Sequence, residues 1–490
     1  MQMIGEDVNP KQKKNKGQGL LLALIILLII ICITIYIYIQ YLDSTIVKFY
    51  KDGQMKKIAD TLLIEDNGTV YVSINGISSM LDYEFKQGIY NTDNQDPNKC
   101  YVKPIQNKEK DKNFEAENMV IAFSLDSGEI LKTPITTQDG TQIDYDVYTI
   151  SKPIKKINGE FYISIEGLQI AYHVKLTINA NQVKLSTLPY LVQYYTQRIA
   201  NYNGLAALST DYSNQVALVY GFIIGSNANG EVGCVYTNGE STKSILDTRF
   251  QAITFNENRG ELIAKIGGKY GIYELDGTRR IEPQYDRIEL LDKNLNYYIV
   301  ENGSKKGLID QNGKIILHTD YTSIGIDISA FKTQNIKNSR LLFENCIPLV
   351  KDGKFGIVDL TGKTLMPFEI DAFGSKASSV DGKTVNPILI IPEYEAIIYM
   401  KNNKYGAIDK TGKSIIPAVL DNVYSITENN VTQYFMKYTT NGIIQTVNVI
   451  DYLKQQGIVE VKKEVKDTPV EEDITIEEDT NNTINNINIE

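Results

Sequence analysis

The second half of this chain of 490 residues repeats itself, and this periodicity constrains its fold more than any other feature. Five segments share one spacing, in which a glycine is followed six residues later by a second glycine. The first glycines are Gly233, Gly271, Gly307, Gly356 and Gly406, and the second are Gly239, Gly277, Gly313, Gly362 and Gly412. The first glycines lie 38, 36, 49 and 50 residues apart, and a degenerate sixth copy begins at Gly442. Because one such unit cannot bury its apolar face alone, we expect the units to fold together as one array.

Each repeat is expected to contain four short strands. Within residues 285–317, strand-like runs alternate with turns at residues 301–303 and 311–313. Asn-Gly and Asp-Gly pairs favour tight hairpins because both residues tolerate a positive φ. The first glycine of each repeat is expected to let an aromatic ring or a neighbouring backbone approach closely. Four strands in 36 to 50 residues is the size of a propeller blade. The sequence therefore predicts an all-β domain over residues 205–455, propeller-like or, as the alternative, a linear stack of hairpins.

The repeats resemble WG repeats, also called KWG repeats. The matching strings are GKYGIYELDGTRRIEPQYD, SKKGLIDQNGKIILHTDYT, GKFGIVDLTGKTLMPFEID and NKYGAIDKTGKSIIPAVLD. The position of the tryptophan that names the family is occupied by Tyr270, Phe355 and Tyr405, and by Lys306 in one repeat. The chain has no tryptophan but 32 tyrosines, so we interpret much of this tyrosine bias as packing within β repeats. The resemblance implies a binding or interaction module without a known catalytic residue.

Three aspartates recur between the apolar strand and the turn of the repeats: Asp310, Asp359 and Asp409. We expect their carboxylates to bond the backbone amides of the turn. A ring of carboxylates or a calcium site is the alternative, but no D-x-D-x-D-G loop is present. The sequence also lacks the G-x-S-x-G, GxxxxGK[ST] and HExxH motifs, and His318 is solitary. We therefore predict no catalytic residue, no cofactor and no metal site, and expect the chain not to be an enzyme.

Residues 46–187 contain a second, smaller duplication. The stretch NGTVYVSINGISSMLDYEF begins at Asn67, and NGEFYISIEGLQIAYHVKL begins at Asn158. Each copy predicts an Asn-Gly turn, an alternating strand and a short helix that opens near Ser73 or Ser164. The insertion at about residues 90–117 is charged and rich in turn residues, which predicts a loop. The pattern resembles the copper amine oxidase N-terminal-like, or stalk, domain of bacterial envelope proteins. That resemblance implies an extracellular spacer or binding module of α+β fold, with no copper site. The lone His173 is expected to be a surface or packing residue and not a ligand.

Residues 20–41 are predicted to form a transmembrane helix. Residues 20–39 carry no charge and are long enough, at about 30 Å as a helix, to span a bilayer core. A cleaved signal peptide is the alternative, but the run is too long and ends in Tyr36, Tyr38 and Tyr41, which suit the membrane interface. Four lysines among residues 11–16 precede the run and Asp43 follows it. The positive-inside rule then places residues 1–19 in the cytoplasm and the C-terminal region outside a single-pass cell membrane protein.

The remaining segments are a linker, a tail and scattered cysteines. Residues 188–204 are expected to form a short amphipathic linker helix. Residues 459–490 carry 10 acids and 3 lysines, which gives this segment −7 of the net charge of −10 and leaves −3 for the rest of the chain. We expect this acidic tail to be disordered. This balance argues against nucleic acid as a partner. Beyond Cys32 in the membrane run, Cys100, Cys234 and Cys346 are widely spaced, so each is expected to be a small buried residue, with one disulfide as the alternative.

The sequence as a whole predicts a membrane-anchored, non-enzymatic binding or scaffold protein of a bacterial cell envelope. Its expected partners are the lipid bilayer, through residues 20–41, and a cell-wall polymer or another envelope protein. Binding of cell-wall glycan or peptidoglycan through tyrosine faces is one alternative. An envelope hydrolase with an unrecognised site is the other.

Overall fold

The computed structural model describes residues 31, 33 and 34 and residues 48–458, without 59–61, 92–93, 106–118, 135–145, 180–181, 203, 332, 335, 337, 377–378, 381 and 429–430. This part of the chain is mainly β, with many antiparallel sheets. The acidic tail lies outside the described residues, and so does the predicted membrane segment except for Ile31, Ile33 and Thr34, which are helical. Within the described part, no helix is both long and apolar enough to cross a bilayer.

The N-terminal domain contains three sheets. The first sheet has the order β12-β13-β1-β2, the second β10-β11-β4-β3 and the third β5-β6-β7-β8-β9. The strands of the first two sheets are β1 (Lys48–Lys51), β2 (Gln54–Lys56), β3 (Leu63–Asp66), β4 (Thr69–Ser73), β10 (Lys155–Ile157), β11 (Glu160–Ser164), β12 (Lys175–Asn179) and β13 (Gln182–Ser186). Those of the third are β5 (Tyr83–Asn91), β6 (Asn94–Pro104), β7 (Met119–Ser124), β8 (Glu129–Pro134) and β9 (Asp146–Thr149).

The two copies of the small duplication pair with each other. Strand β4 of the first copy lies antiparallel to β11 of the second, with Val72 opposite Ile163. Helix α2 (Ile74–Met80) follows β4 and helix α3 (Ile165–Tyr172) follows β11. The hydroxyls of Ser73 and Ser164 accept the amide hydrogens of Gly76 and Gly167, 3.0 and 3.3 Å away, and so cap these helices. The predicted succession of turn, strand and short helix is confirmed in both copies.

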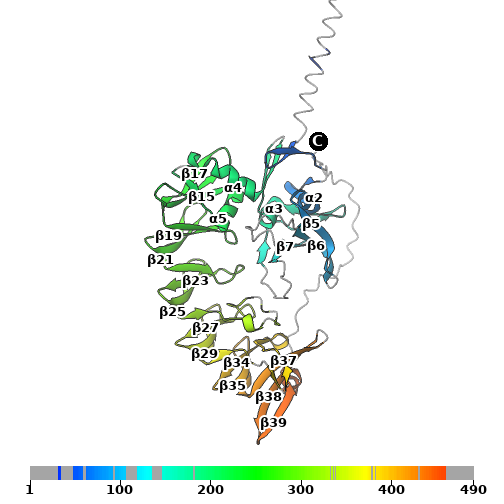
Figure 1. Cartoon of the computed structure of the whole chain (residues 1–490), viewed down its shortest axis with the longest axis vertical. Coiled ribbons are helices and arrows are strands. Elements are labelled where there is room, and N and C mark those ends of the chain that lie inside the picture. The colour runs from blue at the N-terminus through cyan, green and yellow to red at the C-terminus, as the bar shows by residue number, and fades with distance from the viewer. Residues whose placement is uncertain are drawn as a thin grey trace, which may run out of the picture.

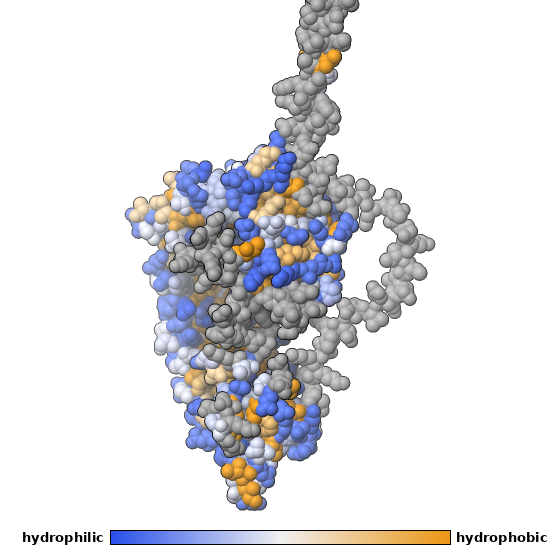
Figure 2. All heavy atoms as spheres, turned by 45° about the vertical axis from the view of Figure 1, so that its right-hand side comes forward, coloured by the Kyte–Doolittle hydropathy of each residue, from blue (hydrophilic) through white to orange (hydrophobic). Residues whose placement is uncertain are grey.

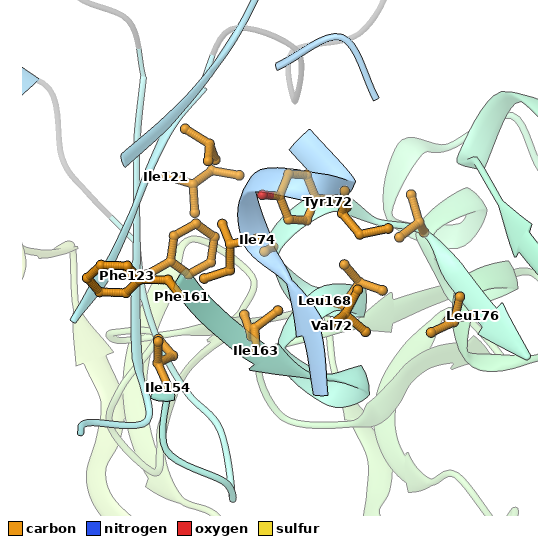
Figure 3. Packing of buried hydrophobic residues seen from close by; sticks show 14 of the residues in the cluster. Val72, Ile74, Ile121, Phe123, Ile154, Phe161, Ile163, Leu168, Tyr172 and Leu176 are labelled. Atoms are coloured by element: carbon orange, nitrogen blue, oxygen red, sulfur yellow. The ribbon is translucent and has the colours of Figure 1, made fainter. Parts of the chain in front are cut away.

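The core of this domain lies between the sheets and the two helices. Figure 3 shows Val72 and Ile163 from the paired strands, Leu168 and Tyr172 from α3, and Phe123 from β7 converging on one apolar interior. The hydroxyl of Tyr172 bonds the Ser78 hydroxyl 2.8 Å away, which satisfies its polar atom inside the core.

The predicted loop at residues 90–117 is in part wrong. Strand β6 (Asn94–Pro104) occupies its first half and pairs with β5 on one side and β7 on the other. Cys100 and Val102 are fully buried on one face of β6, and this burial selects a strand in spite of the charged residues around them. Residues 106–118, the second half, lie outside the described residues.

A short helical segment joins the N-terminal domain to the repeats, as predicted for residues 188–204. It comprises α4 (Leu188–Thr196) and the 3₁₀ turn η2 (Ile199–Asn201). Leu188, Leu191 and Tyr195 bury one side of α4 against the first repeat sheet. Helix α5 (Tyr212–Val216) and the 3₁₀ turn η3 (Ala217–Tyr220) complete this cover.

The repeats form six successive antiparallel sheets. The first four are β14-β15-β16-β17, β18-β19-β20-β21, β22-β23-β24-β25 and β26-β27-β28-β29; the fifth is β30-β34-β35-β36 with β33 beside β34, and the sixth is β37-β38-β39. The strands of the first three are β14 (Ala207–Leu208), β15 (Phe222–Ser226), β16 (Val232–Thr237), β17 (Thr242–Phe250), β18 (Ala252–Asn256), β19 (Glu261–Ile266), β20 (Lys269–Glu274), β21 (Arg279–Tyr285), β22 (Arg287–Leu290), β23 (Tyr297–Asn302), β24 (Lys305–Asp310) and β25 (Ile315–Tyr321).

The later sheets carry insertions. Their strands are β26 (Ser323–Ile324), β27 (Ile347–Lys351), β28 (Lys354–Val358), β29 (Thr364–Ile370), β30 (Ala372–Phe373), β33 (Ile390–Ile391), β34 (Ala396–Lys401), β35 (Lys404–Asp409), β36 (Ser414–Leu420), β37 (Asn422–Glu428), β38 (Val431–Thr440) and β39 (Ile443–Asn448). One insertion carries η4 (Ser329–Phe331), and the other carries β31 (Ser379–Val380), β32 (Lys383–Thr384) and η5 (Pro392–Tyr394). These insertions account for the 49- and 50-residue spacings of the repeats. Helix α6 (Val449–Gln455) follows β39, where a fourth strand would begin.

The six sheets stack one after another in an open array. In Figure 1 they run from β15 and β17 near the N-terminal domain to β38 and β39, and the first and last sheets lie at opposite ends. Contacts such as those of β20 with β22, β24 with β26 and β35 with β37 join each sheet to the next. Each sheet thus has the strand order of a propeller blade, while the sheets succeed each other along a line, as in the predicted linear alternative.

Candidate functional site

The first glycine of each repeat lies where a neighbouring backbone or side chain approaches closely. A Cβ atom at Gly271 would lie 2.5 Å from the Ile281 carbonyl oxygen, and one at Gly307 would lie 2.6 Å from that of Leu317. At Gly356 and Gly406 the nearest atoms belong to the rings of Phe368 and Tyr399, both 2.7 Å away. At Gly233 the nearest atom is the Thr248 methyl, 2.8 Å away. The fourth strand bulges opposite this glycine, since Ile272 pairs with Ile281 while Tyr270 pairs with Tyr285.

The second glycine of each repeat adopts a left-handed backbone in the hairpin turn. The φ angles at Gly239, Gly277, Gly313, Gly362 and Gly412 lie between +82° and +96°. Four of these turns also rest on the preceding repeat. A Cβ atom at Gly277 would lie 2.5 Å from a carbonyl oxygen of β17, and one at Gly362 would lie 2.8 Å from a carbonyl oxygen of β25. One at Gly412 would lie 2.3 Å from a carbonyl oxygen of β29, and one at Gly313 would lie 3.5 Å from Ile281 of β21. The second glycine therefore serves both the turn and the stacking of sheets.

The recurring aspartates lie in these same turns. Asp310 Oδ1 accepts the amide hydrogens of Asn312 and Lys314, each 2.9 Å away. Asp359 and Asp409 accept equivalent amides, and each also accepts a threonine hydroxyl. The carboxylates are therefore engaged by the backbone of the turn, and among the described residues no three His, Cys, Asp or Glu side chains gather as a metal site would require.

The positions that replace tryptophan pack within the sheets. Tyr270, Phe355 and Tyr405 pair across strands with Tyr285, Ile370 and Leu420, and Lys306 pairs with Tyr321. Phe355 also meets Phe373 edge to face, with ring centroids 5.6 Å apart. Tyr405 is buried, and its hydroxyl accepts the Lys376 amide hydrogen. His318 is exposed on β25, and Cys100, Cys234 and Cys346 are buried free thiols.

In three of the repeats, an aspartate after the fourth strand links the repeat to the next sheet. Lys269, Lys354 and Lys404 donate to Asp286, Asp371 and Asp421, each 17 residues further on. The second oxygen of each aspartate accepts from the next sheet: from the Gly303 amide, the Asn402 amide and the Thr439 hydroxyl, each 2.7 Å away. These bonds lower the pKa values of the three carboxyls. In the third repeat, Thr322 stands where this aspartate would be, and its hydroxyl donates to the Val350 carbonyl oxygen.

A pocket of about 400 Å³ lies where the N-terminal domain meets the first repeats. Its lining comes from both sides of this boundary. The N-terminal domain contributes Tyr83, Ile121, Lys132, Tyr148, Ala171, Tyr172 and His173, and the repeats contribute Tyr212, Ser213, Val216, Phe255, Asn256, Glu257, Asn258 and Lys293. Because residues from β5 to the β22–β23 loop meet here, the pocket exists only when the two domains are docked.

A buried polar cluster forms one wall of this pocket. His173 follows α3 in a left-handed conformation, and its Nδ1 lies 2.8 Å from the Tyr212 hydroxyl. Its Nε2 lies 3.2 Å from Glu257 Oε2 and 3.1 Å from Lys132 Nζ. Tyr220 donates its hydroxyl to Glu257 Oε1 at 2.7 Å. The cluster therefore ties α3 and β8 of one domain to α5, η3 and the β18–β19 turn of the other.

The electrostatics of this cluster keep Glu257 ionised and His173 neutral. Burial and the positive charge of Lys132 lower the pKa of His173. Burial alone would raise the pKa of Glu257, but His173, Lys132 and the Tyr220 hydroxyl together lower it to about 2. Burial beside this carboxylate raises the pKa of Tyr220. The tautomer of the neutral imidazole decides whether Nε2 donates to Glu257 or accepts from Lys132, while the Tyr220 hydroxyl donates to Glu257 in either case.

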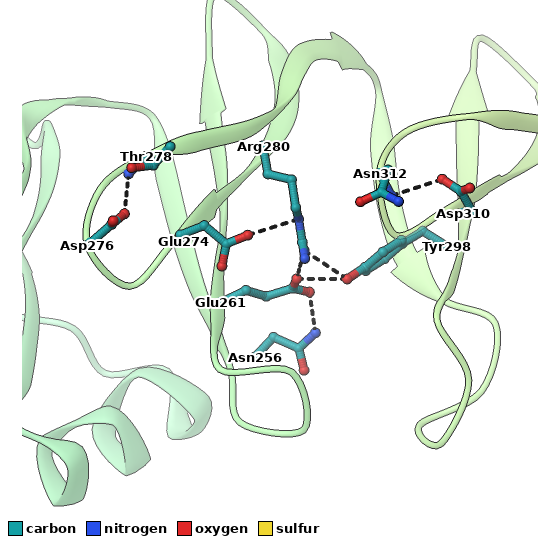
Figure 4. A network of polar contacts seen from close by, with 9 residues as sticks. All are labelled: Asn256, Glu261, Glu274, Asp276, Thr278, Arg280, Tyr298, Asp310 and Asn312. Carbon is teal, nitrogen blue, oxygen red and sulfur yellow. Dashed lines mark hydrogen bonds and ion pairs between the residues drawn. The ribbon is translucent and has the colours of Figure 1, made fainter.

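The turn that carries Glu257 is held from behind by a second network, shown in Figure 4. Glu261 is 0% exposed and accepts from Asn256 and from the Tyr298 hydroxyl, each at 2.7 Å, and from the Arg280 guanidinium. Asn256 is itself a pocket residue, and Tyr298 belongs to the next sheet. The network thus fixes residues 256–261 between the pocket and the third sheet.

The sequence did not predict this pocket. His173 was expected to pack, and it does contact several residues, but its partners lie 39, 41 and 84 residues away along the chain. No spacing or motif connects Lys132, His173, Tyr212 and Glu257 in sequence. The one available signal was the presence of a histidine in a chain that has 2.

Comparison with known proteins identifies one repeat directly. Residues 405–434, which run from β35 into β38, match the family model described as WG containing repeat, so the chain carries a WG repeat there. A search of curated proteins finds no match.

Solved structures give only remote likenesses. The AfRom2 CNH domain is 11% identical, covering 68% of this chain and 91% of that chain with a TM-score of 0.19. The Myceliophteria thermophila Cps50 (Swd1) beta-propeller domain is 8% identical, covering 50% and 87% with a TM-score of 0.20. TM-scores this low do not indicate a shared fold.

Proposed function

We propose that this chain is a non-enzymatic binding or scaffold protein of a bacterial cell envelope. In this proposal residues 20–41 anchor it in the cell membrane, residues 1–19 lie in the cytoplasm and the remainder is extracytoplasmic. The N-terminal domain, which resembles a stalk domain in sequence, holds the repeat array away from the bilayer. The array is the part that contacts another envelope protein.

The main support for this proposal is the structural role of the repeated residues. The glycine pairs, the turn aspartates and the Lys–Asp links all serve folding and stacking, and together they produce an extended surface. A typical glycoside hydrolase would need two carboxylates facing one cleft. The lining of the interdomain pocket contains one carboxylate, that of Glu257, which is already engaged by its neighbours.

One exposed apolar feature marks the end of the array. Ile443 and Ile444, which begin β39, are 65% and 68% exposed. Figure 2 shows hydrophobic side chains at this end of the molecule, below largely hydrophilic sheets. Adjacent exposed isoleucines at a projecting hairpin are typical of contact with a partner.

The test is capture of a partner from membrane extract by the full chain in detergent. We expect the partner to be retained by the native chain and lost with I443S/I444S, which leaves the core intact because both side chains are exposed. Val419→Ser, at a side chain 55% exposed on β36, is the matched control and should retain the partner. Retention of nothing by the native chain would contradict the scaffold proposal.

Binding of cell-wall glycan is the second candidate, and the interdomain pocket favours it. Half of the tyrosines of the array, among them Tyr285, Tyr298 and Tyr434, are buried and cannot stack on a sugar. Three partly exposed tyrosines, Tyr83, Tyr148 and Tyr212, line the pocket beside the buried Tyr172. Retention of the full chain on purified peptidoglycan, compared with retention on membrane extract, separates the two candidates.

A further inference from the structure

We infer that one end of the sheet β12-β13-β1-β2 docks on anionic lipid headgroups of the membrane that anchors the chain. The inference rests on the proposed function, because it takes the anchor in residues 20–41 as given, and it adds a lipid-binding surface to the N-terminal domain. Strand β1 begins at Lys48, so six residues separate it from the end of that anchor. A fully extended segment of this length spans about 25 Å at most, which keeps the start of β1 near the bilayer surface.

The strand register brings four strand ends together at this place. Strand β1 runs parallel to β13, with Lys48 opposite Gln182, and antiparallel to β2, with Phe49 opposite Lys56. Strand β12 runs antiparallel to β13, with Asn179 opposite Gln182. The starts of β1 and β13 and the ends of β2 and β12 therefore lie side by side, where the chain enters the sheet from the anchor. We call this place the proximal end of the sheet.

Three exposed lysines lie at or beside the proximal end. Lys56 is the last residue of β2 and Lys57 follows it, while Lys184 projects from β13 between the buried Val183 and Leu185. None of the three lysines has an ion-pair partner in the part of the chain that the structure describes. Their ammonium groups are therefore available to the phosphates of a lipid surface, and their aliphatic stems can lie along apolar groups below them.

Apolar side chains accompany these lysines. Tyr50 pairs with Lys184 on one side and with Met55 on the other, so the three residues form a row across the outer face of the sheet. Met55 is 56% exposed, and Ile178, near the end of β12, is exposed as well. Lysine interspersed with tyrosine and exposed apolar side chains is typical of surfaces at a membrane interface, where the apolar groups reach below the headgroups.

Negative charge lies mainly away from the proximal end. Among the described residues of this sheet and its turns the one acid is Asp52, at the opposite end of β1, where its carboxylate accepts the amide hydrogen and the hydroxyl of Thr187 at 2.8 and 3.1 Å. With Asp43 and Asp60 included from the sequence, residues 42–61 and 174–187 carry six lysines and three aspartates, a net +3. The whole chain without its acidic tail carries −3, so this positive charge is local and complementary to an anionic surface.

Docking at the proximal end would direct the repeat array away from the bilayer. In Figure 1 the dark blue strands β1 and β2 lie at one end of the molecule, and β38 and β39 lie at the other. Helix α4 begins directly after β13 and packs against the first repeat sheet, so the orientation of this sheet is passed on to the array. The exposed Ile443 and Ile444 would then face the envelope and not the lipid.

The experiment is lysine acetylation of the full chain in phospholipid nanodiscs, read by mass spectrometry. One preparation contains phosphatidylcholine alone, and the other contains about 30% phosphatidylglycerol, which supplies the negative surface. We expect Lys56, Lys57 and Lys184 to react at least about fivefold more slowly in the anionic nanodiscs, because bound headgroups cover their amines. The difference should disappear at about 1 M salt, where the screening length is about 3 Å. Exposed lysines in the turns of the array are the internal reference and should react equally in both preparations: Lys314, Lys363 and Lys413.

The triple variant K56Q/K57Q/K184Q tests the role of charge with a second readout, amide hydrogen exchange. In the native chain, exchange in the hairpins β1–β2 and β12–β13 should be slower in the anionic nanodiscs, and the triple variant should lose this difference. The matched variant K314Q/K363Q/K413Q removes three exposed lysines from the array and should keep it.

Two outcomes would overturn the docking surface: equal acetylation of the native chain in both nanodiscs, or a triple variant that behaves like the native chain. Equal slowing of the reference lysines would also overturn it, because the protection would then not belong to the proximal end. A chain that elutes apart from nanodiscs of both compositions would instead refute the anchor in residues 20–41, so failure of this inference is distinguishable from failure of the proposed function.

Discussion

Replacing Gly412 by alanine tests the claim that the second glycine of a repeat holds two sheets together. Gly412 has φ +87°, and a Cβ atom there would lie 2.3 Å from the carbonyl oxygen of Leu365 in the preceding sheet. The left-handed backbone costs alanine about 1–2 kcal/mol. The forced displacement of a packed backbone adds about 1–3 kcal/mol, so the total is about 2–5 kcal/mol.

Gly353 provides the matched control. Its φ is +76°, but nothing lies within 4 Å of the Cβ position, so Gly353→Ala should cost only the backbone term of about 1–2 kcal/mol. The difference of about 1–3 kcal/mol corresponds to roughly 5- to 150-fold in a local opening equilibrium. Hydrogen exchange of the full chain, read in peptides of β29 and β36 with β18–β21 as the internal reference, measures it. Equal exchange in the two variants would refute the stacking role of Gly412.

Two further perturbations follow from the contacts between sheets and between domains. Thr322→Asp should restore the missing link by pairing with Lys305 and accepting the Asp352 amide, which raises the free energy of unfolding by about 0.5–1 kcal/mol; a urea midpoint that falls would contradict this. Lowering the pH should separate the domains. Because the folded-state pKa of His173 is lowered, its contribution to the free energy of unfolding is full above about pH 6.5 and declines below that pH. The contribution of Glu257 declines from about pH 4.5 toward its folded-state pKa of about 2. Limited proteolysis of the full chain between pH 7 and 4 should show cleavage at residues 188–204 first, and cleavage independent of pH would contradict the cluster's role.

The parts of the fold that depend on neighbours in sequence were predictable. The Asn-Gly turns and the caps Ser73 and Ser164 involve residues three or four positions apart, and so do the turns around the second glycines. For the same reason the hairpin of each repeat follows from two glycines at a fixed offset, since one forces a close approach and the other a positive φ.

The parts that depend on distant burial were not predictable. Strand β6 contains charged residues, and it is a strand because Cys100 and Val102 reach a core that no local pattern reveals. The pocket is a stronger case, since Lys132 and Glu257 belong to different domains and approach each other only through docking. A sequence pattern can indicate which face of a single helix or strand is buried, but the way in which two domains dock depends on their complete surfaces.

The tyrosines and phenylalanine that stand in place of tryptophan also make this protein a natural reporter system. Because the chain contains no tryptophan, its intrinsic fluorescence comes from tyrosine alone. A single Trp introduced at Tyr270, Phe355 or Tyr405 would emit from one known sheet, at a position that already packs an aromatic ring. A set of such variants would report the melting of individual sheets along the stack, and would show directly whether the array unfolds as one unit or from its ends.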